Sequence, residues 1–186
     1  MQTFKILILL LGIFGSSLSG SDFNFELERI EAIKGEEETL IDYSGVRLSR
    51  PGRGESYVAN GFNIISEDLG EDIMHEIKTT YSASGTSQFR VHPYTVQKST
   101  ACEFFKTFYR EYGQPWIAGH TDFPIIPEEG ICPIPKGKYY VKDLLFDSDK
   151  IPSHAPRGWW KFEQIFERNG KCVGGLAMYG RITDKL

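Results

Sequence analysis

The sequence predicts a mainly β protein, an antiparallel sandwich or open barrel of short strands with one short α-helix packed on it. Alternating apolar and polar residues recur in short runs, turn-forming residues separate the runs, and residues 100–113 show helical spacing instead. No internal repeat or linker divides the chain. Residues 20–186 are therefore expected to form one domain, since this is a usual length for a single hydrophobic core.

The first 19 residues have the features of a signal peptide. Lys5 supplies a positive charge, residues 6–14 form a short apolar stretch, and Ser17-Leu18-Ser19 places small residues before the expected cleavage point. The apolar stretch is too short to span a bilayer, with an uncleaved anchor as the alternative. No later stretch approaches membrane length, so the sequence predicts a secreted, extracellular protein without a transmembrane segment.

Four runs in the first half of the chain have the properties of strands. They cover residues 23–33, 40–48, 57–65 and 73–81. Asn60-Gly61 weakens the third run and predicts a bulge, because glycine within a strand often marks one. A further strand begins at Phe89, and Pro93 limits it to the edge or the end of a sheet.

The helix is predicted to begin at Thr100. Residues 100–103 match a capping box, in which Thr100 is the N-cap and Glu103 reaches back to it. Gly113 is expected to end the helix after about three turns. The spacing places Phe104 off the apolar stripe and predicts that three residues face the sheet: Phe105, Phe108 and Tyr109.

Strands return in the second half of the chain. Residues 139–146 are one strand, and residues 158–168 and 171–182 are the two arms of a hairpin. Asn169-Gly170 between these arms is a strong signal for a two-residue turn. Gly174-Gly175 permits either close approach of another backbone or a strained hairpin, and we favour the second.

Composition and motifs argue against several function classes. The chain has 21 basic and 25 acidic residues, a net charge of −4, and removing Lys5 with the signal peptide leaves 20 against 25, or −5. Without a basic stripe, nucleic acid is not an expected partner. Neither a nucleophile elbow, a His-Glu-x-x-His motif nor a phosphate-binding loop occurs, so we expect no enzyme and no cofactor. The 13 Phe and 9 Tyr indicate an aromatic core or a lined cavity.

The chain has three cysteines, Cys102, Cys132 and Cys172. Secretion permits disulfides, and an odd number leaves one thiol unpaired or paired between chains. No Cys-x-x-Cys or His-x-His spacing accompanies them and the four histidines are scattered, so no metal site is expected.

Residues 102–182 resemble a known family through the order and spacing of several motifs. These are a cysteine in the helix, Cys-Pro-Ile-Pro-Lys-Gly at 132–137, Gly-Trp-Trp-Lys-Phe-Glu at 158–163, and a hairpin carrying Gly174-Gly175. The segment resembles the GM2-activator-like lipid-binding proteins and, among them, the insect CheB-type chemosensory proteins. The resemblance implies an antiparallel β-cup around an apolar, lipid-holding cavity, and a disulfide between Cys102 and Cys132.

Candidate ligand-binding residues follow from the alternation in the strands and from the apolar loop at 113–130. A filled core is the alternative for each strand residue, because a cavity wall and a packed core need the same period. The loop residues would form an exposed patch unless they close over the cup or pack elsewhere. The candidates are Ile73, Ile77, Tyr81, Val141, Leu145, Trp160, Phe162 and Phe166 in strands, and Trp116, Ile117, Phe123 and Ile125 in the loop.

The resemblance implies a secreted, non-catalytic carrier or co-receptor for an apolar small molecule such as a long-chain hydrocarbon pheromone, acting in taste with a sensory receptor or ion channel as possible partner. Two alternatives remain open. The first is an activator-type accessory protein that presents a membrane lipid to a hydrolase. The second is a receptor-docking module whose core is filled.

Overall fold

The computed structural model describes residues 23–86, 88–146, 148, 151–152 and 154–185. The predicted signal peptide at 1–19 lies outside these residues. Among the described residues, no helix is long and apolar enough to cross a membrane.

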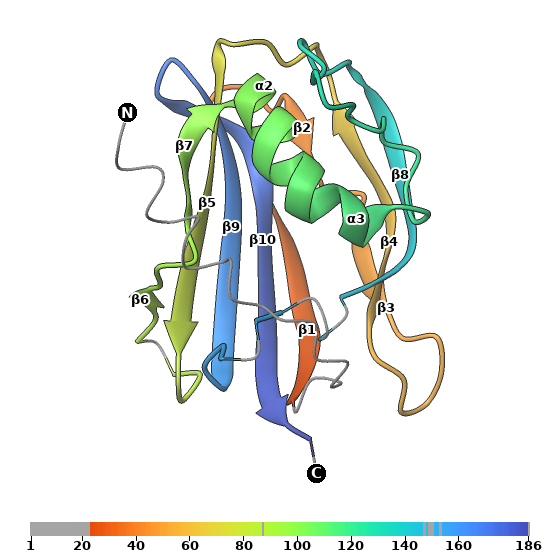
Figure 1. Cartoon of the computed structure of the whole chain (residues 1–186), viewed down its shortest axis with the longest axis vertical. Helices are drawn as coiled ribbons and strands as arrows, with labels where there is room; N and C mark the ends of the chain where they lie inside the picture. Colours follow the sequence, from red (N-terminus) through yellow and green to blue (C-terminus); the bar gives the residue numbers. More distant parts are fainter. Residues whose placement is uncertain (1–22, 87, 147, 149–150, 153, 186) are drawn as a thin grey trace.

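Two antiparallel sheets form the body of the protein (Figure 1). In the larger sheet the order is β1 (Phe23–Ile33), β10 (Lys171–Asp184), β9 (Gly158–Arg168) and β5 (Ile73–Ser82), and both β6 (Arg90–Val91) and β7 (Val96–Thr100) pair with β5. In the smaller sheet β4 (Val58–Ile65) pairs with β2 (Ile41–Asp42), β3 (Arg47–Ser49) and β8 (Gly137–Leu145). The sheets do not close into a barrel. The prediction of a mainly β, open antiparallel architecture with one short helix is confirmed.

The helical segment lies across the larger sheet and is longer than predicted (Figure 1). It consists of α2 (Ala101–Phe104), the π-helical η1 (Phe105–Gly113) and α3 (Gln114–Ile117). Its start is confirmed, because the Glu103 backbone N–H donates to Thr100 Oγ1 at 3.2 Å. The predicted end at Gly113 is wrong. Gly113 keeps right-handed helical dihedrals, φ −76° and ψ −50°, and Pro115 lies in the first turn of α3, where a missing N–H costs little.

Two consecutive phenylalanines, Phe104 and Phe105, face the core where α2 meets η1. The π-helical turns, which bond residue i to i+5, begin only at Phe105. Phe105 is buried as predicted, but Phe104 is also buried, at 3% exposure, and its ring stacks on His75 with centroids 3.5 Å apart. The placement of Phe104 off the stripe was therefore wrong.

Most predicted strands are present, and two predictions need correction. Residues 40–48 do not form one strand, because a turn in which Val46 N–H donates to the Tyr43 carbonyl separates β2 from β3. Strand β7 was missed, since its sequence Val-Gln-Lys-Ser-Thr has a single apolar residue and no alternation. The bulge at Gly61 is confirmed by a register shift and a φ of +126°. The Asn169-Gly170 turn is confirmed by positive φ at both residues.

The main core lies between the helical segment and the sheets. It includes Ile73, Phe105, Ile126 and Phe166, which are each at most 5% exposed. The disulfide between Cys102 and Cys132 that the resemblance implied is present, with Cα atoms 5.3 Å apart, and it joins the start of the helix to the segment before β8. Cys172 is free and half-buried.

Candidate apolar ligand cavity

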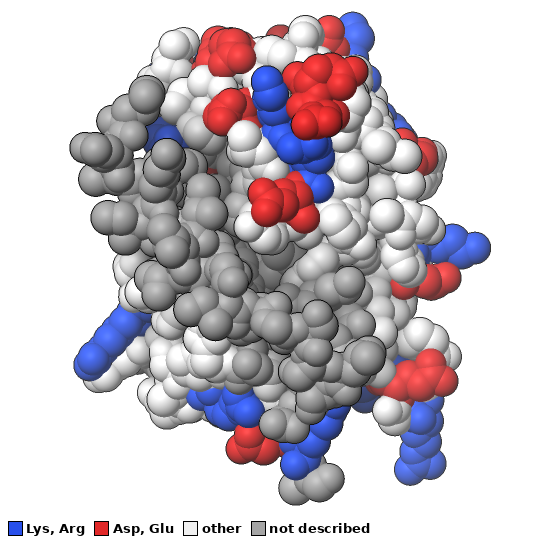
Figure 2. Space-filling view, viewed as in Figure 1, with Lys and Arg blue, Asp and Glu red and all other residues white. Residues whose placement is uncertain are grey.

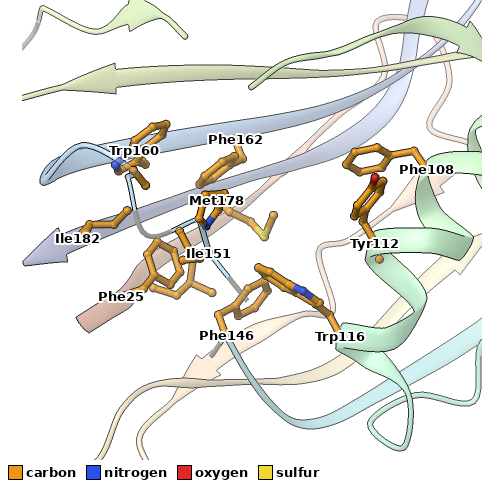
Figure 3. A pocket seen from close by; sticks show the side chains of 14 residues that line it. Phe25, Phe108, Tyr112, Trp116, Phe146, Ile151, Trp160, Phe162, Met178 and Ile182 are labelled. Carbon is orange, nitrogen blue, oxygen red and sulfur yellow. The ribbon is translucent and has the colours of Figure 1, made fainter. Parts of the chain in front are cut away.

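A cavity of about 260 Å³ lies on the helix-bearing face of the larger sheet (Figure 3). Its floor consists of side chains from three neighbouring strands. Strand residues alternate between the two faces of a sheet, so residues two positions apart point to the same side. The floor residues follow this rule: Phe25 and Leu27 on β1, Trp160 and Phe162 on β9, and Met178 and Ile182 on β10.

The wall opposite the floor comes from the second half of the helical segment. Phe108, Tyr112 and Trp116 recur every four residues and line the cavity together with Gly113. Aromatic contacts hold this wall together: the rings of Phe108 and Tyr112 are 5.1 Å apart between centroids. Partial burial raises the pKa of Tyr112 above its usual value, which already lies well above physiological pH, so the phenol is neutral there.

The segment between β8 and β9 closes another side of the cavity. It contributes Phe146, Ile151, Pro152 and Ala155. Phe146 meets Trp116 edge to face, with centroids 6.0 Å apart, and so connects this segment to the helix. Figure 3 shows Phe146 and Trp116 beside one another, across from the strand residues. The cavity is therefore bounded by three parts of the chain that are distant in sequence.

The lining of the cavity is almost wholly apolar. The indole N–H of Trp160 donates to the Pro156 carbonyl at 3.0 Å, so its polar atom is already paired. An apolar cavity of about 150 Å³ stays dry and binds benzene. By that proportion, 260 Å³ offers room for roughly ten carbon atoms, slightly below the usual range of ligand pockets, which begins at about 300 Å³. The arrangement suits an apolar chain of medium length.

Three of the twelve residues predicted to bind ligand line this cavity: Trp116, Trp160 and Phe162. The others lie elsewhere. Ile73 and Phe166 are buried in the main core, against which Ile77 and Phe123 also pack. Tyr81 packs beside Trp160, and its hydroxyl donates to the Arg157 carbonyl at 2.8 Å. Ile117 and Val141 pack against a smaller core cluster, while Ile125 and Leu145 are exposed, at 79% and 48%.

Sequence reasoning missed most of the lining, although part of it left a signal. The alternation in residues 23–28 marks Phe25 and Leu27, and the helical spacing marks Phe108 and Tyr112. Ile151 and Ala155 gave no such signal, because they belong to a connection without a period. Phe146 was placed at the end of the predicted strand at 139–146 and lies one residue beyond β8. The predicted patch at 113–130 does not stay together: Trp116 faces the cavity, Phe123 packs on the main core, and Ile125 faces solvent.

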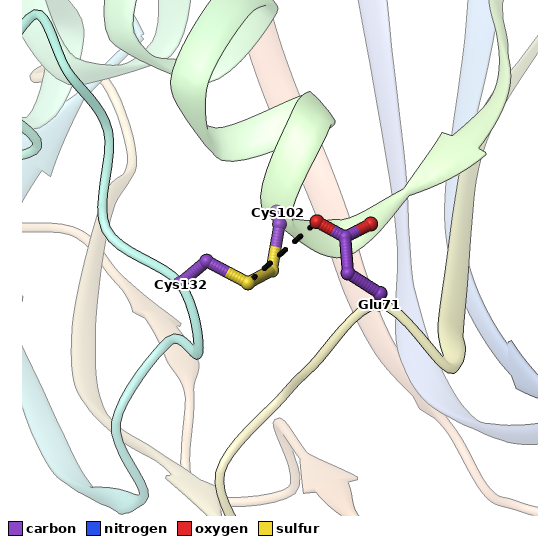
Figure 4. Close-up of side chains that lie close together, drawn as sticks. All are labelled: Glu71, Cys102 and Cys132. Carbon is purple, nitrogen blue, oxygen red and sulfur yellow. Dashed lines mark hydrogen bonds between the residues drawn. A yellow bond between two sulfur atoms is a disulfide. The ribbon is translucent and has the colours of Figure 1, made fainter.

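Glu71, Cys102 and Cys132 lie close together at the start of the helix (Figure 4). One carboxylate oxygen of Glu71 is 3.7 Å from Cys132 Sγ. Both sulfurs belong to the disulfide, so neither can act as a thiolate ligand. The group is therefore part of a covalent link and offers no ligand set for a metal.

Charged side chains are mixed on the face that carries the helix. Figure 2 shows acidic and basic groups side by side at the top and along the lower rim of that face. Over the described part of this face, the charges do not separate into a patch of one sign. The visible surface therefore has no strong electrostatic preference for a highly charged partner.

A profile of the family described as "Protein of unknown function (DUF1091)" matches residues 76–162, just under half of the chain. The match runs from β5 to the first residues of β9, so it includes the disulfide, the helical wall, Trp160 and Phe162. It leaves out β1 and β10, which supply the rest of the floor. No curated protein matches the chain.

Proposed function

We propose that this protein is a secreted, non-catalytic binding protein that holds one apolar chain in the cavity. The observation that carries the proposal is a space of about 260 Å³ bounded almost entirely by carbon. Each methylene moved from water into such a space gains about 0.8 kcal/mol, so ten would contribute about 8 kcal/mol before the costs of ordering. No catalytic group is needed for this role.

The biological setting rests on the resemblance described above. We propose a place among the GM2-activator-like proteins, near the CheB-type branch, with a carrier or co-receptor role in taste and a sensory receptor or ion channel as partner. The size of the cavity favours a chain of about ten carbons. A long-chain hydrocarbon would have to extend beyond the cavity or widen it.

The experiment is native mass spectrometry of the mature protein with apolar chains of eight to sixteen carbons. We expect a one-to-one complex that is lost in Phe162→Glu, because this change places a carboxylate in the apolar space. Met178→Trp should also abolish binding, by filling the cavity without adding charge. Phe89→Glu is the matched control, since Phe89 is exposed and lies outside the cavity.

Other results would favour the two alternatives. An activator-type protein should also bind vesicles, and Trp116→Ala should weaken that binding. A docking module with a filled core should form no complex with any chain in correctly disulfide-bonded protein, and that result would overturn the proposal.

A further inference from the structure

A second hollow adjoins the apolar cavity and is lined mainly by polar and charged side chains. It is a groove of about 410 Å³ beside β1, the edge strand of the larger sheet. Its walls come from β1, from the end of β10, from residues 50–56 and from the segment after β8. Polar side chains that line the groove include Asn24, Glu26, Arg50, Glu55, Arg181 and Thr183.

Phe25 and Phe146 line both hollows, so they form the boundary between them. The pairing of β1 with β10 explains the change of character over so short a distance. Phe25 pairs with Ile182, which lines the apolar cavity. The pairs on either side, Asn24 with Thr183 and Glu26 with Arg181, line the groove. Successive pairs point to opposite faces of a sheet, so this two-stranded ribbon supplies an apolar wall on the face toward the helix and a polar wall on the other face.

Among the described residues that line the groove, positive and negative charges balance. The groove is lined by two arginines, Arg50 and Arg181, and by two glutamates, Glu26 and Glu55. Arg50 pairs with Glu26 at 3.0 Å, and Arg181 lies 3.3 Å from Glu28, with side chains that are between a third and a half exposed. These groups remain accessible to a ligand. A head of one net charge would find as many repelling as attracting partners, whereas a head carrying both signs can pair with each.

We propose that the two hollows form one site for an amphiphile with a zwitterionic head. The chain, of about ten carbons, lies in the apolar cavity, and the ligand passes around the edge strand β1 beside Phe25 and Phe146, so that the head lies in the groove against Arg50, Arg181 and the glutamates. This inference rests on the proposed function, because it needs the cavity to hold a chain. It adds selection by the head to selection by the length of the chain.

The test uses four probes that share a ten-carbon chain: decan-1-ol, decanoic acid, decyltrimethylammonium and decylphosphocholine. Binding is measured by isothermal titration calorimetry on the mature protein. We expect decylphosphocholine to bind about tenfold more tightly than any of the other three, the gain of one charge-assisted hydrogen bond. Equal affinities for all four would overturn the zwitterionic site and leave the apolar carrier intact. Binding of none would overturn the proposed function itself.

Variants then separate the groove from the cavity. Arg50→Gln and Arg181→Gln should each weaken decylphosphocholine about threefold, so that together they remove the tenfold preference, and both should leave decan-1-ol unchanged. Arg90→Gln is the matched control, because Arg90 lies on β6, beyond β5 and at the side of the sheet opposite to β1. If Arg90→Gln has the same effect as the groove variants, or if the groove variants weaken both probes equally, the head does not lie in the groove.

Discussion

His75 is the most unusual single residue in the core. It is fully buried, with its ring between Phe104 and Phe166. The Gln164 side-chain N–H donates to His75 Nε2 at 3.1 Å, and Gln164 Oε1 accepts from the Tyr43 hydroxyl at 3.4 Å. His75 Nδ1 is buried without a hydrogen-bond partner. The surroundings therefore suit a neutral ring and offer nothing to stabilise a charged one.

Burial lowers the pKa of His75 to about 3, and this predicts a loss of stability in acid. In the unfolded chain His75 takes up a proton near pH 6.5, whereas in the folded protein it does not. The contribution of His75 to the free energy of unfolding is therefore fully present above pH 6.5 and decreases as the pH falls toward 3. The slope from this group approaches about 1.4 kcal/mol per pH unit.

Urea unfolding between pH 7 and pH 4.5 measures this slope. The His75→Phe variant keeps a ring in place but cannot titrate, so its stability should fall less steeply than that of the unmodified protein. Parallel curves for the two proteins would show that His75 takes up its proton without unfolding.

At the scale of elements, Gly174 allows β10 to pass close to β2. It has a φ of +132°, and a Cβ at this position would lie 2.1 Å from the Ile41 carbonyl oxygen. The neighbouring Gly175 would place a Cβ 2.1 Å from the Gln164 carbonyl oxygen. Both interpretations of Gly174-Gly175 therefore hold: the positive φ and the register shift between Cys172 and Gly174 are the strain that was favoured, and other backbone segments also approach closely.

Gly174→Ala should therefore destabilise the protein far more than Gly170→Ala. Both glycines have positive φ, +78° at Gly170 and +132° at Gly174, and such conformations cost a residue with a Cβ about 1–3 kcal/mol. Only Gly174 adds a collision with backbone, since a Cβ at Gly170 meets nothing within 4 Å. Thermal unfolding of the two variants compares them directly. Equal losses would mean that β2 moves away from β10 at little cost.

The elements that the sequence predicted well are those whose signal is local. Strand alternation, the Thr100 cap and the Asn169-Gly170 turn depend on neighbouring residues, and all three are present. Periodicity does not distinguish π-helical turns from α-helical ones. The break between β2 and β3 is also local, because the Ser44 N–H donates to Asp42 Oδ1 within Asp42-Tyr43-Ser44-Gly45, a turn sequence that was interpreted as part of a strand. The alternating apolar residues of β1 and β9 predicted part of the cavity floor. Whether two apolar surfaces pack together or leave a cavity between them depends on the whole fold, so the sequence pattern could not predict it.

At the scale of the whole molecule, the helix is held at one end and lines the cavity with the other. Cys102 at its start is bonded to Cys132, while Phe108, Tyr112 and Trp116 form the cavity wall further along. The disulfide and the cavity thus lie at different ends of one segment. Global stability and ligand binding should respond differently when the disulfide is removed.

The double variant Cys102→Ala/Cys132→Ala tests this separation. The bonded residues are 30 positions apart, and closing a loop of that length stabilises the fold by about 3–4 kcal/mol in the chain-entropy model. We expect a loss of that size in urea unfolding, with the affinity of the folded protein for decan-1-ol within about twofold of the unmodified protein, a difference below 0.5 kcal/mol. Cys172→Ala is the control, because Cys172 is free and its removal opens no loop. A large loss of affinity in the double variant would show that the helix transmits the constraint along its length, and the cavity would then depend on the disulfide for its shape.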